Sequence, residues 1–327
     1  MKFPARRRFV AFAAAAAAAP FAALGQSHRE VPRIGYLASQ TPDAYFDAFQ
    51  QHLRKLGYAP GSNISLEVRN ADGRLDQIPG LINELVALNV SVLVATNNVA
   101  IAAARKATDR IPIVMNASID PVAAGYVATL ARPGGNITGV ANLRRELSTK
   151  RIQLLREIFP KLSRLAVLWD SDGPGPKVAV ASYEAAAEAA GIRVQSLAIR
   201  GPQPDLESAF RAATSDRAEA LIVVSNPLTT QHRPAILALS LKSRLPAIGE
   251  SEDWTNAGAL ISYAPSTGEI AQRLAAYVDR ILKGGKPAEL PVEQPTNFDS
   301  DLNLKTAKAL GVKLPQPVLV RAGRLIE

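Results

Sequence analysis

The sequence predicts an α/β protein made of two Rossmann-like (flavodoxin-like) lobes with parallel sheets, joined by a multi-strand hinge. Three observations lead to this prediction. Val90–Ala95 is an apolar run of strand length, which is typical of a strand buried on both faces. An Ala-rich helical pattern, Val99–Thr108, and a second apolar run, Ile113–Met115, come next. The same order of features then returns in the second half of the chain.

The repeat has a nearly constant offset. Three pairs of landmarks lie 129 to 134 positions apart: Arg33 and Arg164, Thr96 and Ser225, and Pro112 and Pro246. Two parallel strands joined by a helix form a right-handed crossover unit, and ligands bind beyond the carboxyl ends of such strands. We therefore expect each lobe to present its strand ends to a shared cleft.

The first half alternates strands and helices. Its helices carry apolar residues at helical spacing, Gly57 is a helix stop, and its second strand alternates apolar and polar residues. Before the central stretch, the expected elements are the strand Arg33–Ser39, the helix Pro42–Leu56, the strand Ile64–Val68 and the helix Asp76–Leu88. Ile137–Leu143 then leads out of this half.

The second half repeats this order and adds a tail. Its expected elements are the helix Lys150–Ile158, the strand Arg164–Asp170, the helix Val178–Ala190, the strand Val194–Ile199, the helix Asp205–Thr214, and strands at Leu221–Asn226 and Leu245–Ser251. The tail reads as a helix over Thr267–Leu282, an extended piece over Leu290–Gln294 and a helix over Leu302–Leu310. We expect crossings between lobes near Asn142, Ala264 and Leu290. The first lobe then takes residues 31–141 and 266–290, and the second takes 142–265 and 291–327.

Residues 1–25 have the three-part pattern of an export signal. Lys2 and three arginines form a basic start, Phe9–Ala19 is apolar, and Ala23–Gly25 is a small-residue cleavage site. The apolar core is too short to span a bilayer permanently. Arg6–Val10 also resembles a twin-arginine signal, so both export routes stay open. The sequence therefore predicts an exported, periplasmic protein.

Charge and cysteine content exclude several classes of protein. Subtracting the four basic residues of the signal from the net charge of +9 leaves +5, and the remaining charges are interspersed. Without a basic stripe that carries interleaved aromatics, nucleic acid is a poor partner. The chain has no Cys, which excludes a lipid anchor at the signal junction, a disulfide framework and a Cys nucleophile.

Catalytic and cofactor motifs are missing from the sequence. The three histidines, at positions 28, 52 and 232, are scattered and lack metal-ligand spacing. The sequence contains no G-x-S-x-G, G-x-G-x-x-G or Walker motif. We therefore expect no cofactor, no metal site and no enzymatic activity.

Binding residues are expected at strand ends, where helix N-termini also favour anions. Thr96 and Ser225 either bind ligand or cap their helices, and both roles are compatible. Asp120 and Glu250 suit a ligand ammonium group, although Asp120 also suits a cap of its own Asp-Pro turn. Trp169 either stacks on a planar ligand or packs under a helix. The full set of candidate ligand-binding residues is Ser39, Gln40, Thr96, Asn97, Ser118, Asp120, Asn142, Trp169, Ser225, Asn226, Glu250 and Tyr263.

Several segments together resemble a known family. They are IPIVMNASIDPVAAG from Ile111, LARPGGNITGV from Leu130, ILKGGKPAELPVE from Ile281 and LNLKTAKALGVKLPQPVLVRA from Leu302. The sequence is similar to the ABC-transporter substrate-binding proteins, a family that includes tryptophan- and tyrosine-binding proteins. The resemblance runs from about Arg33 to the end. It implies a type I periplasmic binding protein that holds a small ligand between two lobes. Where the family often has Gly-Thr-Pro and Val-Thr-Asp-Pro, this chain has Ala95-Thr96-Asn97 and Ser118-Ile119-Asp120-Pro121.

Signal, duplicated lobes and missing catalytic groups together predict the periplasmic solute-binding component of an ABC importer. Its expected partners are a small solute, with a tilt toward an amino acid or an aromatic compound, and a permease in the inner membrane. We expect a monomer. A periplasmic sensor that presents its closed form to a receptor is the alternative. An exported hydrolase has only His232 as a base, and a repressor lacks a DNA-binding segment ahead of Arg33.

Overall fold

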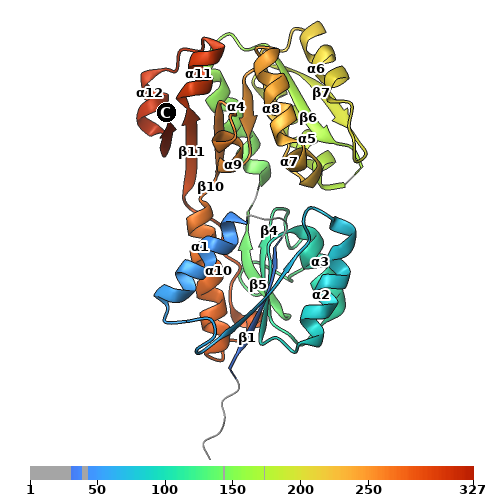
Figure 1. Cartoon of the computed structure of the whole chain (residues 1–327), viewed down its shortest axis with the longest axis vertical. Coiled ribbons are helices and arrows are strands. Elements are labelled where there is room, and N and C mark those ends of the chain that lie inside the picture. The colour runs from blue at the N-terminus through green and yellow to red at the C-terminus, as the bar shows by residue number, and fades with distance from the viewer. Residues whose placement is uncertain (1–30, 39–42, 143, 173) are drawn as a thin grey trace, which may run out of the picture. The chain divides into compact units, whose positions relative to one another are not determined.

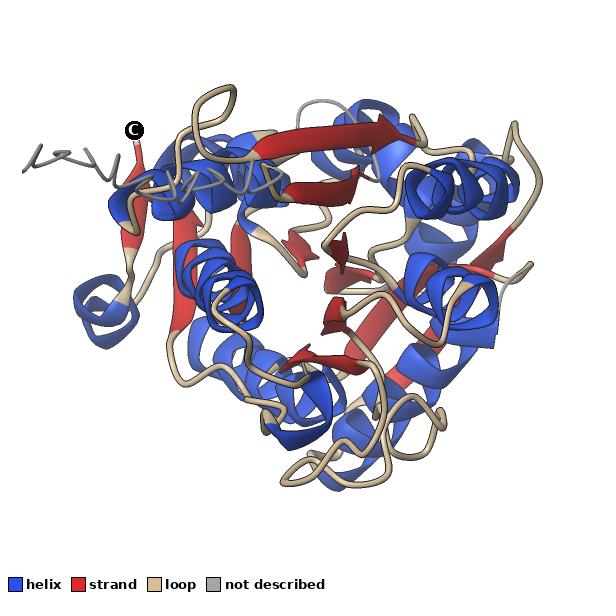
Figure 2. Cartoon of the chain, turned by 90° about the horizontal axis from the view of Figure 1, so that it is seen from below, coloured by secondary structure: helices blue, strands red, loops and turns tan. Residues whose placement is uncertain are grey.

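The computed structural model describes residues 31–38, 43–142, 144–172 and 174–327. Two β-sheets organise these residues, and helices lie on both sides of the strands (Figure 1, Figure 2). We call each sheet, with the helices packed on it, a lobe.

The first sheet has five strands in the order β2-β1-β3-β4-β5, and every neighbouring pair is parallel. Its strands are β1 (Arg33–Ala38), β2 (Ser65–Asn70), β3 (Val92–Ala95), β4 (Ile113–Ala117) and β5 (Ile137–Ala141). This is the order of flavodoxin-like sheets. The chain adds β2 on one side of β1 and then adds β3, β4 and β5 on the other side, so the strand order reverses between β1 and β3. Ligands of such sheets bind beyond the carboxyl ends of the strands at that point.

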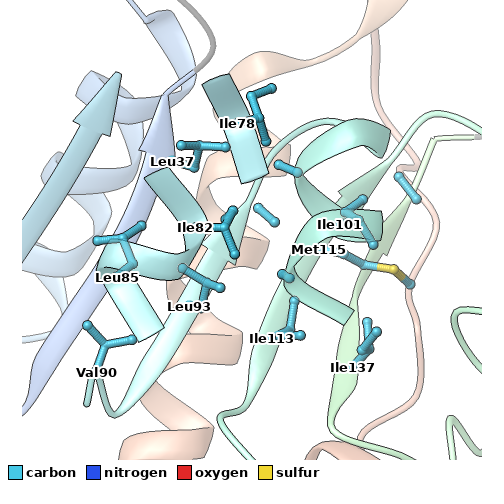
Figure 3. Close-up of a cluster of buried hydrophobic side chains, with 14 of the residues drawn as sticks. Leu37, Ile78, Ile82, Leu85, Val90, Leu93, Ile101, Ile113, Met115 and Ile137 are labelled. Atoms are coloured by element: carbon cyan, nitrogen blue, oxygen red, sulfur yellow. The ribbon is translucent and has the colours of Figure 1, made fainter. Parts of the chain in front are cut away.

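Helices cover both faces of the first sheet because its central strands are apolar on both sides. All residues of β3, β4 and β5 are buried. On one face lie α2 (Ile78–Ala87), which follows the short turn η1 (Leu75–Gln77), and α3 (Asn98–Ala107). Figure 3 shows Ile82 and Leu85 of α2 packed against Leu93 of β3 in this core. On the other face lie α1 (Ala44–Lys55) and α10 (Thr267–Leu282).

The second sheet has seven strands in the order β12-β11-β10-β9-β8-β6-β7. They are β6 (Arg164–Asp170), β7 (Arg193–Ile199), β8 (Ala220–Val223), β9 (Ala247–Gly249), β10 (Ile261–Pro265), β11 (Phe298–Asn303) and β12 (Arg324–Ile326). From β7 to β10 the order and parallel direction repeat those of the first sheet. This repetition confirms the predicted fold class of two Rossmann-like lobes.

The second lobe also has a helical layer on each face. One core joins the sheet to α4 (Arg144–Ile158) and α5 (Pro174–Ala189). The other joins it to α6 (Leu206–Ser215), α8 (Arg233–Lys242) and α9 (Glu252–Asn256). The remaining elements are α7 (Pro227–Gln231), η2 (Pro287–Glu289), α11 (Leu304–Leu310) and α12 (Gln316–Arg321).

The chain passes between the two sheets three times: between β5 and α4, between β10 and α10, and ahead of β11. The third passage lies later than the predicted boundary at Leu290. Val292 still packs in the first core, and Glu293 forms a β-bridge with Val140 of β5. Residues up to Glu293 therefore belong with the first sheet.

The predicted helix over Leu302–Leu310 is wrong in its first part. Phe298–Asn303 is the strand β11, which pairs antiparallel with β10, and the helix α11 starts only at Leu304. Asn303 marks the change, because its side chain accepts a hydrogen bond from the Thr306 N–H, 2.9 Å away, and so caps α11. The second sheet thus contains one antiparallel pair.

The hydrogen bond between α10 and the segment after α1 predicts a pH dependence. The Tyr58 hydroxyl donates to Asp279, at 2.9 Å. Burial first, and the Asp279 carboxylate second, raise the pKa of Tyr58 from 10.0 to about 12. Since only the unfolded state ionises Tyr58 in this interval, its contribution to stability is complete below about pH 10 and is lost as the pH rises toward 12. Urea unfolding at intervals from pH 9 to 12 measures this. In Tyr58→Phe the alkaline decline should be shallower; equal declines contradict the assignment.

Candidate functional site

Thr96 and Asn97 follow β3 in the first lobe, as predicted, and both serve the local structure. The Asn97 side chain caps α3 by accepting a hydrogen bond from the Ala100 N–H at 2.8 Å. The Thr96 hydroxyl donates to the Leu37 carbonyl of β1, 3.3 Å away. Both residues are only partly buried. They fix the loop at the point where β1 and β3 diverge. Ser39 and Gln40 lie outside the described residues.

Asn98 joins the loops after β3 and β4, and the sequence analysis did not single it out. Its side-chain nitrogen donates to the Ser118 hydroxyl at 2.6 Å, and its side-chain oxygen accepts from the Ser118 N–H at 3.1 Å. The Tyr126 hydroxyl donates to the Asn98 carbonyl at 3.2 Å. The available signal was its position as the last of three small polar residues after a strand. This reciprocal pair places one side-chain amide and one hydroxyl group beside each other at the carboxyl ends of β3 and β4.

Asp120 is exposed and caps its own turn. One carboxylate oxygen accepts from the Val122 N–H at 2.9 Å and the Ala123 N–H at 3.2 Å. This is the local role that its Asp-Pro sequence also predicted.

Asn142 lies at the first passage and is paired inside the protein. Its side-chain nitrogen donates to the Asn116 side-chain oxygen of β4 at 2.7 Å, and its backbone N–H donates to the Ala117 carbonyl. Both asparagine side chains are buried. The Asn142 side-chain oxygen has no partner among the described residues. A buried acceptor of this kind favours a donor from a bound molecule or water.

Ser225 and Asn226 follow β8, at the position that Thr96 and Asn97 have in the first lobe. Asn226 forms a capping box with Thr229 at the start of α7, and its side-chain nitrogen donates to Asp170 at 2.5 Å. The Ser225 hydroxyl accepts from the Trp254 indole N–H at 2.9 Å. The loop after β8 is therefore held to the end of β6 and to α9.

Glu250 follows β9, and its surroundings differ from the prediction that it holds a ligand ammonium group. One oxygen accepts from the Tyr183 hydroxyl at 2.6 Å and from Arg151 at 3.1 Å. The other oxygen accepts from the Ser225 N–H at 2.8 Å. The side chain is buried, and the Arg151 guanidinium balances its charge. Its donors thus come from the protein itself.

Arg151 and Tyr183 are the central residues that sequence reasoning missed. Arg151 is 1% exposed, and it also donates to the Tyr263 carbonyl at 2.8 Å and to the Tyr183 hydroxyl at 2.7 Å. Burial raises the pKa of Tyr183 well above its ordinary value, and Glu250 adds to this although Arg151 opposes it. Burial lowers the pKa of Arg151, but Tyr183 and Glu250 outweigh it and the net direction is upward. Arg151 therefore stays charged and Tyr183 stays protonated.

The two aromatic candidates have different environments. Trp169 packs against the core under α4 and α5, and its indole N–H donates to the Ser196 hydroxyl at 2.7 Å. Of the two predicted roles, the structure shows packing. The Tyr263 ring, on β10, stacks on Phe298 of β11 with centroids 5.8 Å apart and planes 14° apart. Phe298 is 39% exposed, so this aromatic pair reaches solvent beside the second passage.

A carboxylate also ties the second and third passages together. Glu269, in the first turn of α10, accepts from Arg273 and from the backbone N–H groups of Thr296 at 3.1 Å and Asn297 at 2.7 Å. Burial raises the pKa of Glu269, but these hydrogen bonds outweigh it, so the net pKa is lowered. Arg273 also pairs with Glu293. The start of α10 is thus fixed to the segment that leads into β11.

In the described ranges, no group of three or more His, Cys, Asp or Glu side chains is placed to hold a metal ion. None of the helices in these ranges is long and apolar enough to cross a membrane.

Comparisons with known proteins agree with the fold and the sequence motifs. Residues 35–326 match the family model of the ABC transporter substrate binding proteins. The tyrosine-binding protein of Clostridioides difficile (strain R20291) is 24% identical over 266 residues, which are 81% of this chain and 76% of that protein.

Two solved structures extend the comparison. An ABC domain from Streptococcus pneumoniae in complex with L-Trp is 26% identical, with a TM-score of 0.81 over 90% of this chain and 99% of that one. An ABC-transporter solute-binding protein from R. palustris in complex with benzoate shares the fold alone, at 13% identity and a TM-score of 0.56 over 76% and 74%. These matches confirm the resemblance found in the sequence, to binding proteins rather than enzymes. The chain belongs to the family of ABC transporter substrate-binding proteins.

Proposed function

We propose that this chain is the periplasmic solute-binding component of an ABC importer and that it binds one small solute between its two lobes. One observation carries the proposal. The order β2-β1-β3-β4-β5 of the first sheet recurs as β7-β6-β8-β9-β10 in the second, and each sheet has hydrogen-bonded polar residues just beyond two corresponding strands, β3 and β4 in the first and β8 and β9 in the second. These residues are Asn98 and Ser118 in the first lobe, and Ser225, Asn226 and Glu250 in the second.

An aromatic amino acid is the ligand class that we propose. The tyrosine-binding relative and the structure in complex with L-Trp support it. The partly exposed Tyr263–Phe298 pair offers a flat apolar surface for a ring. The unpartnered oxygen of Asn142 offers an acceptor for an ammonium group.

The candidate residues divide into contacts and supports. We assign direct contacts to Thr96, Asn98, Ser118, Ser225 and Asn226, whose side chains are only partly buried at strand ends. Asn97, Asp120 and Glu250 shape the loops, because their side chains are bonded to backbone N–H groups. Ser39 and Gln40 follow β1 and remain candidates for contact. Trp169 supports the second lobe from its core.

Ligand binding is coupled to closure in this proposal. A solute that contacts both lobes stabilises the arrangement in which they approach each other, because only that arrangement provides both sets of contacts. The permease in the inner membrane then recognises the closed form. A monomer is sufficient for this function, and light scattering of the purified protein tests that expectation.

Binding is tested by thermal shift and calorimetry with L-tryptophan, L-tyrosine, L-phenylalanine and benzoate. A ligand present at a hundred times its Kd should stabilise the protein by about 2.7 kcal/mol. Stabilisation by the amino acids but not by benzoate supports the proposed class. A protein that none of these compounds stabilises does not bind aromatic amino acids.

Asn98→Ala should weaken binding of the amino acid by about tenfold, since one lost hydrogen bond of about 1.4 kcal/mol corresponds to that factor. The matched control is Asn136→Ala, at the amino end of β5. Its side chain donates to two backbone carbonyls, those of Thr108 and Ile111. The control should lower stability and leave the affinity unchanged. Calorimetry measures the affinity of both variants for the amino acid. Equal losses of affinity in the two variants contradict the assignment of Asn98 as a ligand contact.

Export follows from the proposed signal over residues 1–25. The chain expressed with these residues in a Gram-negative host should appear in the periplasmic fraction in a shortened form. Mass spectrometry of that form gives the cleavage site. A full-length, cytoplasmic product speaks against a signal.

A further inference from the structure

Arg151 connects parts of the second lobe that the chain separates widely. It lies on α4 and contacts Tyr183 of α5, the Tyr263 carbonyl of β10 and Glu250 after β9. The Nε of Arg151 donates to the Tyr263 carbonyl. One terminal nitrogen, Nη1, donates to both the Tyr183 hydroxyl and the Glu250 carboxylate. A single guanidinium thus joins two helices, a strand and a strand-end loop.

Glu250 extends this connection to the proposed ligand loop. Its second oxygen accepts the Ser225 N–H at 2.8 Å, directly after β8. Ser225 in turn accepts from the Trp254 indole. A change at the Ser225 loop therefore reaches Arg151 through one carboxylate.

Arg151 also links the segments next to the first two passages. Helix α4 follows the first passage, and β10 precedes the second. The 2.8 Å bond from Arg151 to the Tyr263 carbonyl fixes these two segments to each other. The movement of one lobe against the other turns about the three passages, and these segments adjoin two of them.

Stability alone does not account for this arrangement. Replacing a buried ion pair by well-packed apolar residues is often neutral or stabilising. The second terminal nitrogen of Arg151 is buried without a partner among the described residues, which costs about 1–3 kcal/mol. This nitrogen is able to donate a hydrogen bond to a new acceptor when the crossing segments shift.

We propose that Arg151 is a positioning residue that transmits the state of the Ser225–Glu250 loop to the two crossing segments and so sets the resting arrangement of the lobes. The proposal rests on the proposed function, because it assigns ligand contact to that loop. It requires that a change at Glu250, which is bonded to Arg151 of α4, alters the distance between the lobes through Arg151.

The experiment measures that distance without ligand. The chain has no Cys, so two introduced cysteines accept spin labels selectively. Lys106→Cys on α3 and Lys242→Cys on α8 place one label on an exposed position of each lobe. Pulsed electron–electron double resonance on the full-length protein gives the distance distribution for the parent, R151M, E250Q and the double variant. Arg164→Met is the matched control, because Arg164 pairs with Asp216 at the opposite end of the same sheet.

Arg151→Met and Glu250→Gln should each broaden or shift the distribution, and E250Q should add nothing in the R151M background. The Arg164→Met distribution should match that of the parent. If E250Q leaves the distribution unchanged, or if its effect adds fully to that of R151M, the proposal is wrong. If R151M does not fold, Arg151→Lys replaces it, since lysine cannot keep the Tyr263 and Tyr183 contacts together. A failed ligand screen leaves this measurement intact, so the two proposals fail separately.

Discussion

Arg151→Met is expected to lower the free energy of unfolding by about 3–5 kcal/mol, because it removes the counter-ion of the buried Glu250 side chain. Both side chains are nearly inaccessible, at 1% and 3% exposed. The Tyr263 carbonyl and the Tyr183 hydroxyl lose a donor at the same time. Urea or guanidinium unfolding measures the loss, with the midpoint and slope compared to the parent.

The control for this prediction is an exposed ion pair. Arg69 and Glu84 are 2.7 Å apart, but their side chains are 29% and 56% exposed. Arg69→Met should therefore cost about 0–1 kcal/mol. A loss at Arg151 no larger than that at Arg69 means that the buried pair contributes little, and it removes the energetic basis for the positioning role.

Gly139→Ala should be the most destabilising of the glycine substitutions in the first sheet. Gly139 lies in β5 with a φ of +135°, and a Cβ there would lie 2.2 Å from the Met115 carbonyl oxygen and 2.6 Å from the Met115 nitrogen. Those atoms belong to the neighbouring strand β4 and cannot move like a side chain. Strain costs about 1–3 kcal/mol, and overpacking costs about 1–3 kcal/mol more.

Gly135→Ala is the comparison for Gly139→Ala. A Cβ at Gly135 meets nothing within 4 Å, and its φ lies outside the left-handed region. The substitution should change stability by less than about 1 kcal/mol, with a gain expected from the less flexible unfolded chain. Thermal or chemical unfolding of both variants measures the difference. Similar effects at the two positions contradict the close approach of β5 to β4.

Most of the parallel framework was predictable because its signals are local. Val92–Ala95 and residues 221–224 are apolar throughout, and strands covered on both faces typically have that composition. The constant offset between halves then predicted a second sheet like the first. The C-terminal part of the chain lies beyond the repeat, so the offset predicts nothing about its elements. The strand β11 reads FDSDLN, and its Asp, Ser and Asn residues are typical of turns. Pairing with β10, fixed from elsewhere in the chain, makes it a strand.

The site was less predictable than the fold, because partners come from distant elements. The strand-end positions of Ser118, Ser225 and Glu250 follow from the sheet. Arg151 could have been found from its spacing. Leu147, Arg151 and Leu155 recur at helical period on the buried side of α4, so an arginine stands where an apolar residue is expected. Its partners Tyr183 and Glu250, 32 and 99 positions away, could not be read from that pattern.

Neither lobe is continuous in the chain, and this has a consequence for biosynthesis. The first sheet needs α10 to cover one of its faces, and the second needs β11 and β12 at its edge. A nascent chain therefore cannot complete either lobe until the ribosome has passed residue 267. Multidomain proteins usually finish their N-terminal domain first during synthesis. Here the interleaved order delays the completion of both lobes until the last part of the chain has been made.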